Sequence, residues 1–281
     1  MVDFTFDNYW RSLEEEVSKA GGHRAVVTEM PLRSTEGSTG YNVWMHSTGG
    51  FKIFAHYSVP KGDGPFPGLF MAPGYGSVVA VPSYERRQHF VVLALSARGQ
   101  RLSDDKYASE YPGLLTDRIE DPYSYPYRGM VADCLTAIDF LRGRPEVDSS
   151  RLGISGADLA FIAAGLRSEF SAALIDSPVL FRDTSSRFSV TTTYPLEELN
   201  DYLRAHPDQT SSVRSTLELF DPLNFTDRIK CKVFVTCSEG EKGFVNTLVG
   251  ALGDRAEFRI KTGRGYLDHV AEEAWLKAAV G

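Results

Sequence analysis

A carboxylate occupies the position where a sharp strand-to-helix turn would expose a reactive side chain. Residues 152–155 predict a short buried strand, and the alanine-rich stretch after residue 160 predicts an apolar helix. The turn between them fits the pattern small–x–nucleophile–x–small, because bulky neighbours would clash in so tight a bend. In the frame Gly-Ala-Asp-Leu-Ala at residues 156–160, the central position is Asp158. Ser155 is the alternative nucleophile, but it lies at the strand end, and its frame misplaces the second small residue.

An aspartate at this position favours chemistry other than serine-type ester cleavage. Its carboxyl has a reference pKa of about 3.9 and is ionised at neutral pH unless burial desolvates it. A carboxylate that attacks an alkyl ester must expel a far more basic alkoxide, so collapse back to the reactants is favoured. Asp158 could instead remove a proton as a general base, or attack an sp³ carbon to form an alkyl-enzyme ester that water hydrolyses.

Apolar strands alternate with amphipathic helices along the chain, and this order predicts an α/β fold with a mostly parallel central sheet and helices on both faces. Two short helical patterns around Pro207 predict a small helical cap at about residues 181–220. No Gly/Ser- or Pro-rich linker divides the chain, so residues 1–281 are expected to form one domain with an N-terminal helical arm at about residues 1–20. The strand patterns lie at residues 51–59, 66–72, 90–95, 152–155, 172–175, 233–237 and 256–260, and the main helical patterns at 6–20, 129–141, 244–252 and 266–280.

Residues that could do chemistry follow the predicted strands directly. In open parallel sheets, sites form at the carboxyl ends of the strands. The loops at those ends hold Tyr75, Asp158, the acids Glu239 and Glu241, and His269. The order along the chain, with the turn residue first, an acid next and a histidine last, is that of the α/β-hydrolase fold.

Four further stretches carry a family resemblance. Residues 73–76, Pro-Gly-Tyr-Gly, are similar to a His-Gly-Tyr loop, and residues 98–103 are similar to an Arg-Gly-Gln-Gly-x-Ser motif. Residues 120–148 look like the loop and helix that precede the strand-to-helix turn in the same family, and residues 220–231 look like the segment before its catalytic acid. With these motifs the chain resembles, over nearly its whole length, the bacterial acetyl xylan esterase / cephalosporin C deacetylase family.

The resemblance implies roles for individual residues. The backbone N–H groups of Tyr75 and Leu159 would form the oxyanion hole, Glu241 would be the orienting acid with Glu239 as the alternative, and His269 would be the partner of the turn residue. The family has Gly-Gly-Ser-Gln-Gly at the turn, so its serine is Asp158 here.

Two residues near the pocket mouth are expected to bind substrate. The glycine that follows Arg-Gly-Gln in the family is Arg101 here, and a cation there would suit an anionic substrate such as a tetronate. Gln100, from the same motif, is the second candidate. Arg98 is expected to be a buried arginine that anchors its own loop.

These features together favour an acetate-eliminating lyase. Some α/β-hydrolase-fold enzymes of tetronate polyketide pathways eliminate acetate from an acetylated intermediate, and converting an acetyl-ester pocket to elimination by replacing its nucleophile needs the fewest changes. Three alternatives stay open: an Asp-nucleophile hydrolase of the dehalogenase or epoxide-hydrolase type, an acetyl esterase, and a pseudo-hydrolase that binds a ligand without turnover.

Composition limits the partners. The net charge of −7 argues against nucleic acid, and there is no apolar run near the roughly 18 residues of a membrane span. The N-terminus lacks the basic start and apolar stretch of a signal peptide, so a cytoplasmic location is expected. The three cysteines lack metal-ligand spacing, no cofactor motif appears, and the expected partner is a small-molecule substrate. The resemblance also implies a homo-oligomer.

Overall fold

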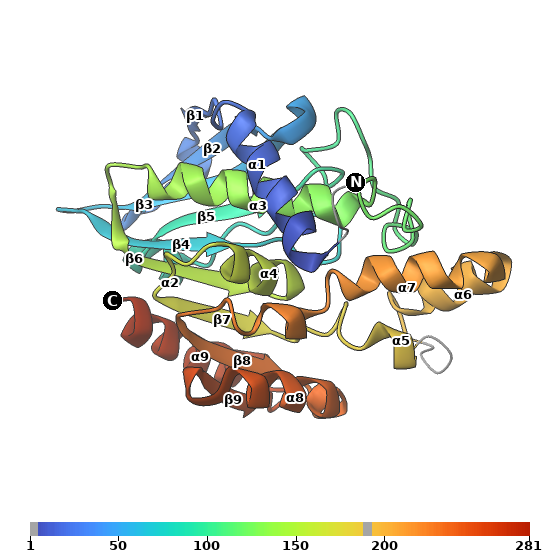
Figure 1. The fold of residues 1–281 in the computed structure, drawn as a ribbon. Coiled ribbons are helices and arrows are strands. Elements are labelled where there is room, and N and C mark those ends of the chain that lie inside the picture. Colours follow the sequence, from blue (N-terminus) through green and yellow to red (C-terminus); the bar gives the residue numbers. More distant parts are fainter. Residues whose placement is uncertain (1–4, 188–192) are drawn as a thin grey trace.

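The computed structural model describes residues 5–187 and 193–281, and within them nine strands form one sheet (Figure 1). Their order across the sheet is β1-β2-β3-β5-β4-β6-β7-β8-β9. The pairs β1–β2, β2–β3 and β3–β5 are antiparallel, and all the other pairs are parallel. The strands are β1 (Val26–Glu29), β2 (Ser38–His46), β3 (Lys52–Pro60), β4 (Phe66–Met71), β5 (Val91–Ser96), β6 (Val147–Gly156), β7 (Ala172–Asp176), β8 (Lys232–Cys237) and β9 (Ala256–Ile260).

The central strands are buried on both faces, as their apolar runs predict. Every residue of β5 is buried, and successive side chains along a strand point to opposite faces. Phe70 of β4 therefore belongs to one core cluster and its neighbour Leu69 to the other. A sheet buried in this way needs a layer of helices on each face.

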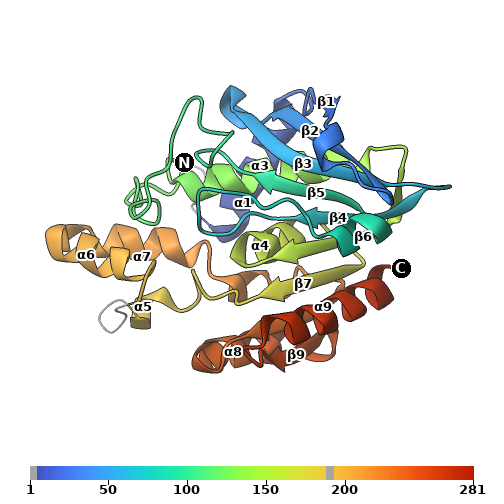
Figure 2. The same cartoon turned by 180° about the vertical axis from the view of Figure 1, so that it is seen from behind.

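Helices form both of these layers (Figures 1 and 2). Helices α3, α4 and α8 pack on one face, with α1 outside α3, and helices α2 and α9 pack on the other. The α-helices are α1 (Phe6–Lys19), α2 (Tyr84–His89), α3 (Pro126–Arg142), α4 (Asp158–Leu166), α5 (Thr184–Arg187), α6 (Glu197–Ala205), α7 (Thr210–Glu218), α8 (Lys242–Leu252) and α9 (Gly265–Val280). Short 3-10 segments lie at η1 (Pro31–Arg33), η2 (Thr48–Gly50), η3 (Pro207–Gln209), η4 (Pro222–Phe225), η5 (Glu239–Glu241) and η6 (Gly253–Arg255).

The predicted N-terminal helix is confirmed as α1. The side chain of Thr5 caps it by accepting a hydrogen bond from the Asn8 N–H at 3.3 Å. Its apolar stripe, which includes Tyr9 and Trp10, is buried. The Trp10 indole donates to the Leu219 carbonyl at 3.1 Å, so α1 fastens the end of the cap to the main body. Residues 1–4 of the predicted arm lie outside the described residues.

The cap consists of helices α5, α6 and α7, which lie beyond the carboxyl ends of the strands (Figure 1). Helices α6 and α7 flank Pro207, as the two helical patterns predict. Residues 188–192 of the predicted cap lie outside the described residues. The cap therefore lies over the carboxyl ends of the strands, which is where sites form in this kind of fold.

The sequence patterns do not predict strands β1 and β2 or helix α2. Strand β1 lies at the edge of the sheet and is mostly exposed. Strand β2 begins with Ser38, Thr39 and Gly40 and carries polar Asn42, so the alternation of apolar and polar residues in its sequence is weak. Pairing with β3 along nine residue pairs, rather than its own pattern, holds β2 in the sheet.

Candidate active site

The strand-to-helix turn predicted from the sequence is present at the carboxyl end of β6. Gly156 ends the strand with φ at 148°, a conformation that strains other residues. A Cβ at Gly156 would also lie 3.0 Å from the Ala160 Cβ and 3.2 Å from the Ala72 backbone oxygen. Only glycine therefore suits this position, and helix α4 begins two residues later at Asp158.

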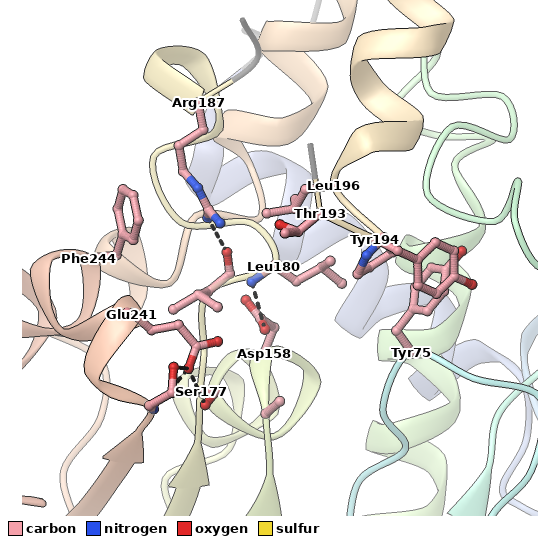
Figure 3. Close-up of a pocket in the computed structure, with 15 residues that line it drawn as sticks. Tyr75, Asp158, Ser177, Leu180, Arg187, Thr193, Tyr194, Leu196, Glu241 and Phe244 are labelled. Atoms are coloured by element: carbon pink, nitrogen blue, oxygen red, sulfur yellow. Dashed lines mark hydrogen bonds between the residues drawn. The ribbon is translucent and has the colours of Figure 1, made fainter. Parts of the chain in front are cut away.

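The carboxylate of Asp158 is buried and held by two backbone amides. Its side chain lies in the cleft of Figure 3, and the residue is only 4% exposed. One oxygen accepts from the Leu180 N–H and the other from the Phe181 N–H, each at 3.2 Å. Burial raises the pKa of Asp158 to about 7, although these two hydrogen bonds oppose the rise. Near neutral pH, both the ionised and the neutral form are therefore populated.

Asp158 lies in the wall of a cavity of about 630 Å³ between the carboxyl ends of the strands and the cap (Figure 3). This volume suits a small-molecule ligand. One side is aromatic, where the rings of Tyr75 and Tyr194 meet edge to face at 5.4 Å between centroids. The described residues that line the cavity are Tyr75, Ala157, Asp158, Ser177, Val179, Leu180, Arg187, Thr193, Tyr194, Pro195, Leu196, Ser238, Gly240, Glu241 and Phe244.

Of the two residues predicted to hold an anion, Leu159 follows Asp158 in helix α4, and Tyr75 lines the cavity on a loop that Gln100 positions. The side-chain amide of Gln100 donates to the carbonyls of Gly74 at 3.1 Å and Gly76 at 2.6 Å, on either side of Tyr75. Gln100 is 2% exposed and is not among the described cavity residues, so its side chain stabilises the loop that carries Tyr75. In the described part of the chain, no hydrogen-bond acceptor is found for the N–H of Tyr75 or of Leu159.

Of the two candidate acids, Glu241 faces the cavity. Its carboxylate accepts from the Ser238 N–H at 2.9 Å, the Ser238 hydroxyl at 2.6 Å and the Ser177 hydroxyl at 3.0 Å. Burial alone would raise the pKa of Glu241, but these hydrogen bonds hold it below its usual value. Glu239 does not line the cavity and lies 3.5 Å from the Lys242 ammonium.

The structure does not bring His269 together with Asp158 and Glu241. His269 lies in the second turn of α9, is not among the described cavity residues, and has its Nδ1 3.8 Å from a Glu273 oxygen. Its neighbour Asp268 accepts from the Thr262 N–H and hydroxyl, both at 3.0 Å. These bonds anchor the start of α9 ahead of the histidine, so His269 is fixed within a helix rather than carried on a loop.

Among the described residues of the cavity lining the cation is Arg187, which the sequence patterns do not single out. Arg101, the predicted substrate-binding cation, is exposed and lies outside the described cavity lining, with its N–H donating to the Ser77 carbonyl at 2.8 Å. Arg187 lines the cavity and lies 4.3 Å over the Phe244 ring. A charged residue in a predicted cap is the only signal that could have pointed to it.

Arg98 is the buried loop anchor that its motif predicts. Its guanidinium pairs with both oxygens of Asp133, at 2.6 and 3.0 Å, and donates to the Thr48 hydroxyl at 2.9 Å. It therefore ties its loop to helix α3 and the segment after β2, away from the cavity.

The described residues contain no group of three or more His, Cys, Asp or Glu side chains that could hold a metal ion. Across residues 5–187 and 193–281, no helix has both the length and the apolar character of a membrane span.

The chain matches the family model described as acetyl xylan esterase over residues 2–241. Among curated proteins it is similar to the acetyl esterase Axe7A of Xylanibacter ruminicola, with 23% identity over 247 residues. That alignment covers 82% of this chain but 55% of the relative, so the chain spans about half the length of the curated relative.

Solved structures show the fold. The acetyl xylan esterase from Paenibacillus sp. R4 superposes with a TM-score of 0.85 and 25% identity, covering 99% of this chain and 96% of that one. Acetyl xylan esterase 1 from Thermoanaerobacterium sp. JW/SL YS485 gives the same TM-score at 20% identity, covering 98% and 94%. The predicted α/β-hydrolase fold, with its mostly parallel central sheet and surrounding helices, is thereby confirmed.

Proposed function

The chain belongs to the acetyl xylan esterase family, and from that premise we propose that it eliminates acetate from an acetylated small molecule, with Asp158 as the general base. The observation that carries the proposal is the burial of Asp158 in the cavity wall with its pKa raised to about 7. A general base works best when its pKa lies near the operating pH. An ordinary aspartate, with a pKa of about 3.9, would be too weak a base to remove a proton from carbon efficiently.

The proposed reaction is a β-elimination. The ionised Asp158 takes a proton from the carbon next to a carbonyl group, and the C–H electron pair becomes the new C=C bond. The bond between the β carbon and the acetate oxygen breaks, and its electrons leave with acetate. The N–H groups of Tyr75 and Leu159 are suited to hold the leaving acetate, as oxyanion-hole amides do for other oxyanions. Loss of the proton to solvent returns Asp158 to its carboxylate form.

The position of His269 favours elimination over hydrolysis through an aspartyl ester. An alkyl-enzyme ester must be cleaved by water, which needs a second base. His269 does not line the described cavity, and Glu241, which does, has a lowered pKa and is a weak base. Elimination needs only the one base at Asp158, so the cavity suits it better.

The acetyl esterase alternative has little support in the side chains around Asp158. The turn carries no hydroxyl at the nucleophile position. The hydroxyl of Ser177 lines the same cavity, but it is bound to the Glu241 and Asp176 carboxylates at 3.0 and 3.2 Å, without a histidine partner in the described lining. Ser177→Ala is therefore the control for any ester hydrolysis that the protein shows.

An acetylated tetronate-like polyketide intermediate is the proposed substrate class. The resemblance to acetate-eliminating enzymes of tetronate pathways supports this choice. The cavity of about 630 Å³ is large enough for a small cyclic molecule of that kind.

The proposal is tested with the acetyl ester of a simple β-hydroxy ketone. The wild type should release acetate and the enone, and Asp158→Asn should lower the rate by about 10²-fold or more. Ser177→Ala should leave the rate within about twofold of the wild type, because elimination by Asp158 needs no hydroxyl nucleophile. Formation of the β-hydroxy ketone in place of the enone would contradict the proposal.

A further inference from the structure

Arg187 is the only cation among the described residues that line the cavity. It ends helix α5 in the cap and points into the cleft above Asp158 (Figure 3). The other charged side chains in the described lining, Asp158 and Glu241, are acids. An arginine is cationic in any protein environment, so Arg187 places a fixed positive charge opposite a base.

The guanidinium is held by neutral groups. One nitrogen donates to the carbonyls of Val179 and Arg182, at 2.5 and 3.0 Å, and the guanidinium lies over the Phe244 ring. Within residues 5–187 and 193–281, no carboxylate lies within ion-pair distance of Arg187. Its charge is therefore oriented by the protein without an ion-pair partner in these ranges, while the carboxylates of Asp158, Asp183 and Glu241 lie near enough to act on it electrostatically.

Several other poorly exposed arginines are paired with a carboxylate, whereas half-buried Arg255, like Arg187, is bound by backbone carbonyls. Arg98 pairs with Asp133 at 2.6 Å, Arg182 with Asp221 at 3.1 Å, and Arg86 with a Glu273 oxygen at 2.5 Å. Pairing is the usual way to offset the cost of burying a charge. Arg187 is held by carbonyls and a ring in the described part of the chain, which leaves part of its planar fork available for a ligand.

One short segment fixes the distance between the cation and the base. The carbonyl of Val179 accepts from Arg187, and the next two residues, Leu180 and Phe181, donate their N–H groups to Asp158. Three consecutive residues therefore position both groups on the same cavity. A substrate bound at Asp158 would therefore lie in the same cavity as Arg187.

We infer that Arg187 binds an anionic oxygen of the substrate, either a carboxylate or the oxygen of an acidic enol. This inference rests on the site of the proposed function and narrows its substrate to acetylated compounds with such a group. Removing a proton next to the carbonyl places negative charge on that oxygen, and a preorganised cation stabilises it as it forms. Arg187, rather than Arg101, is then the residue that sets specificity for anions.

Binding of a matched pair of probes tests this inference without any turnover. Phenylacetate and phenylacetamide have nearly the same shape and differ in charge. Calorimetric titration of the wild type should show phenylacetate bound about tenfold more tightly, which is the scale of one charge-assisted hydrogen bond. Arg187→Gln should abolish this preference, and Arg187→Lys should retain part of it, because lysine keeps the charge but not the fork.

Arg101→Gln is the matched control, and it should bind both probes as the wild type does. Equal affinity of the wild type for the two probes, or no binding of either, would overturn the inference, and these results need no variant that folds. A preference that survives in Arg187→Gln but is lost in Arg101→Gln would also overturn it. If the preference depends on Arg187 while acetate elimination is absent, the anion site stands and the proposed function fails. If elimination occurs and Arg187→Gln keeps the preference, only the present inference fails.

Discussion

The carboxylate of Glu198, in cap helix α6, accepts a hydrogen bond from the phenol of Tyr75, which lines the same cavity as Asp158. Its other oxygen accepts from the N–H groups of Gly113 and Leu115, at 2.9 and 3.2 Å. One buried carboxylate therefore joins the cap, the Tyr75 loop and the loop before α3. Burial and this bond together raise the pKa of the Tyr75 phenol, so it stays protonated as the donor.

Replacing Glu198 should loosen this junction. In Glu198→Ala, the Gly113 and Leu115 amides lose their acceptor, and each buried unpaired group costs about 1–3 kcal/mol. For a chain of this size, 1 kcal/mol corresponds to about 2–4 °C in the melting temperature, so a fall of several degrees is expected in thermal denaturation. Glu197→Ala, on the same helix but partly exposed, is the control and should change the melting temperature by no more than about 1 °C. Equal melting temperatures for the two variants would show that the junction contributes nothing to stability.

The rate of the proposed elimination should rise with pH through about 7. Only the ionised form of Asp158 accepts a proton, and burial raises its pKa to about 7. Below that pH the carboxyl becomes neutral, so kcat/KM should fall by about tenfold per pH unit, and above it the rate should level off. The measurement is kcat/KM for the acetylated β-hydroxy ketone across this range. A rate that is flat from about pH 5 to pH 8 would contradict the assignment of Asp158 as the titrating base.

His269→Ala should leave the elimination rate within about twofold of the wild type. The imidazole of His269 lies beside Glu273 on α9 and outside the described cavity lining, so it neither accepts the substrate proton nor orients Asp158. Loss of a general base would instead cost about 10²–10⁴-fold. A loss of that size in His269→Ala, with an unchanged melting temperature, would mean that the histidine reaches the cavity during turnover and would favour the hydrolytic alternative.

The pair between Arg98 and Asp133 should matter for stability rather than for chemistry. Asp133→Ala leaves the buried guanidinium of Arg98 without its carboxylate, and breaking a buried pair in this way costs about 3–5 kcal/mol. Urea denaturation should detect this loss. Asp139→Ala is the control on the same helix, because Asp139 is partly exposed and its ion pair with Arg167 is longer, at 3.5 Å. A difference of less than about 1 kcal/mol between the two variants would contradict the role of Arg98 as an anchor.

The parts of the fold that follow from local pattern could be predicted from the sequence. Strands β4, β5, β7, β8 and the carboxyl half of β6 are short apolar runs, and β9 alternates apolar with charged residues. The turn at Asp158 needs the small residues that its motif contains. The strands β1 and β2 could not be predicted in this way, because β1 is an exposed edge and β2 depends on its pairing with β3.

The candidate site was harder to predict from the sequence than the fold, because it depends on contacts between distant segments. Asp158, Tyr75 and Glu241 line one cavity as their positions after strands predict, whereas Arg187 becomes visible only when the cap is placed. His269 lies elsewhere because it is in the second turn of α9 with its Nδ1 3.8 Å from a Glu273 oxygen, and the packing that sets the direction of this side chain is not encoded in a motif. The catalytic roles assigned to these residues, the homo-oligomer and the cytoplasmic location stay predictions.

The oxygen content of the released acetate tests the central claim most directly. The acetyl ester of a β-hydroxy ketone is turned over in ¹⁸O-labelled water, and the acetate is analysed by mass spectrometry. Elimination breaks the bond between the β carbon and oxygen, so both oxygens of acetate come from the substrate and the acetate should be unlabelled, with the enone as the other product. Acetate that carries one ¹⁸O atom, with the β-hydroxy ketone beside it, would mean that water attacks the acyl carbon. That result would contradict the account of Asp158 as an eliminating base and identify the protein as an acetyl esterase.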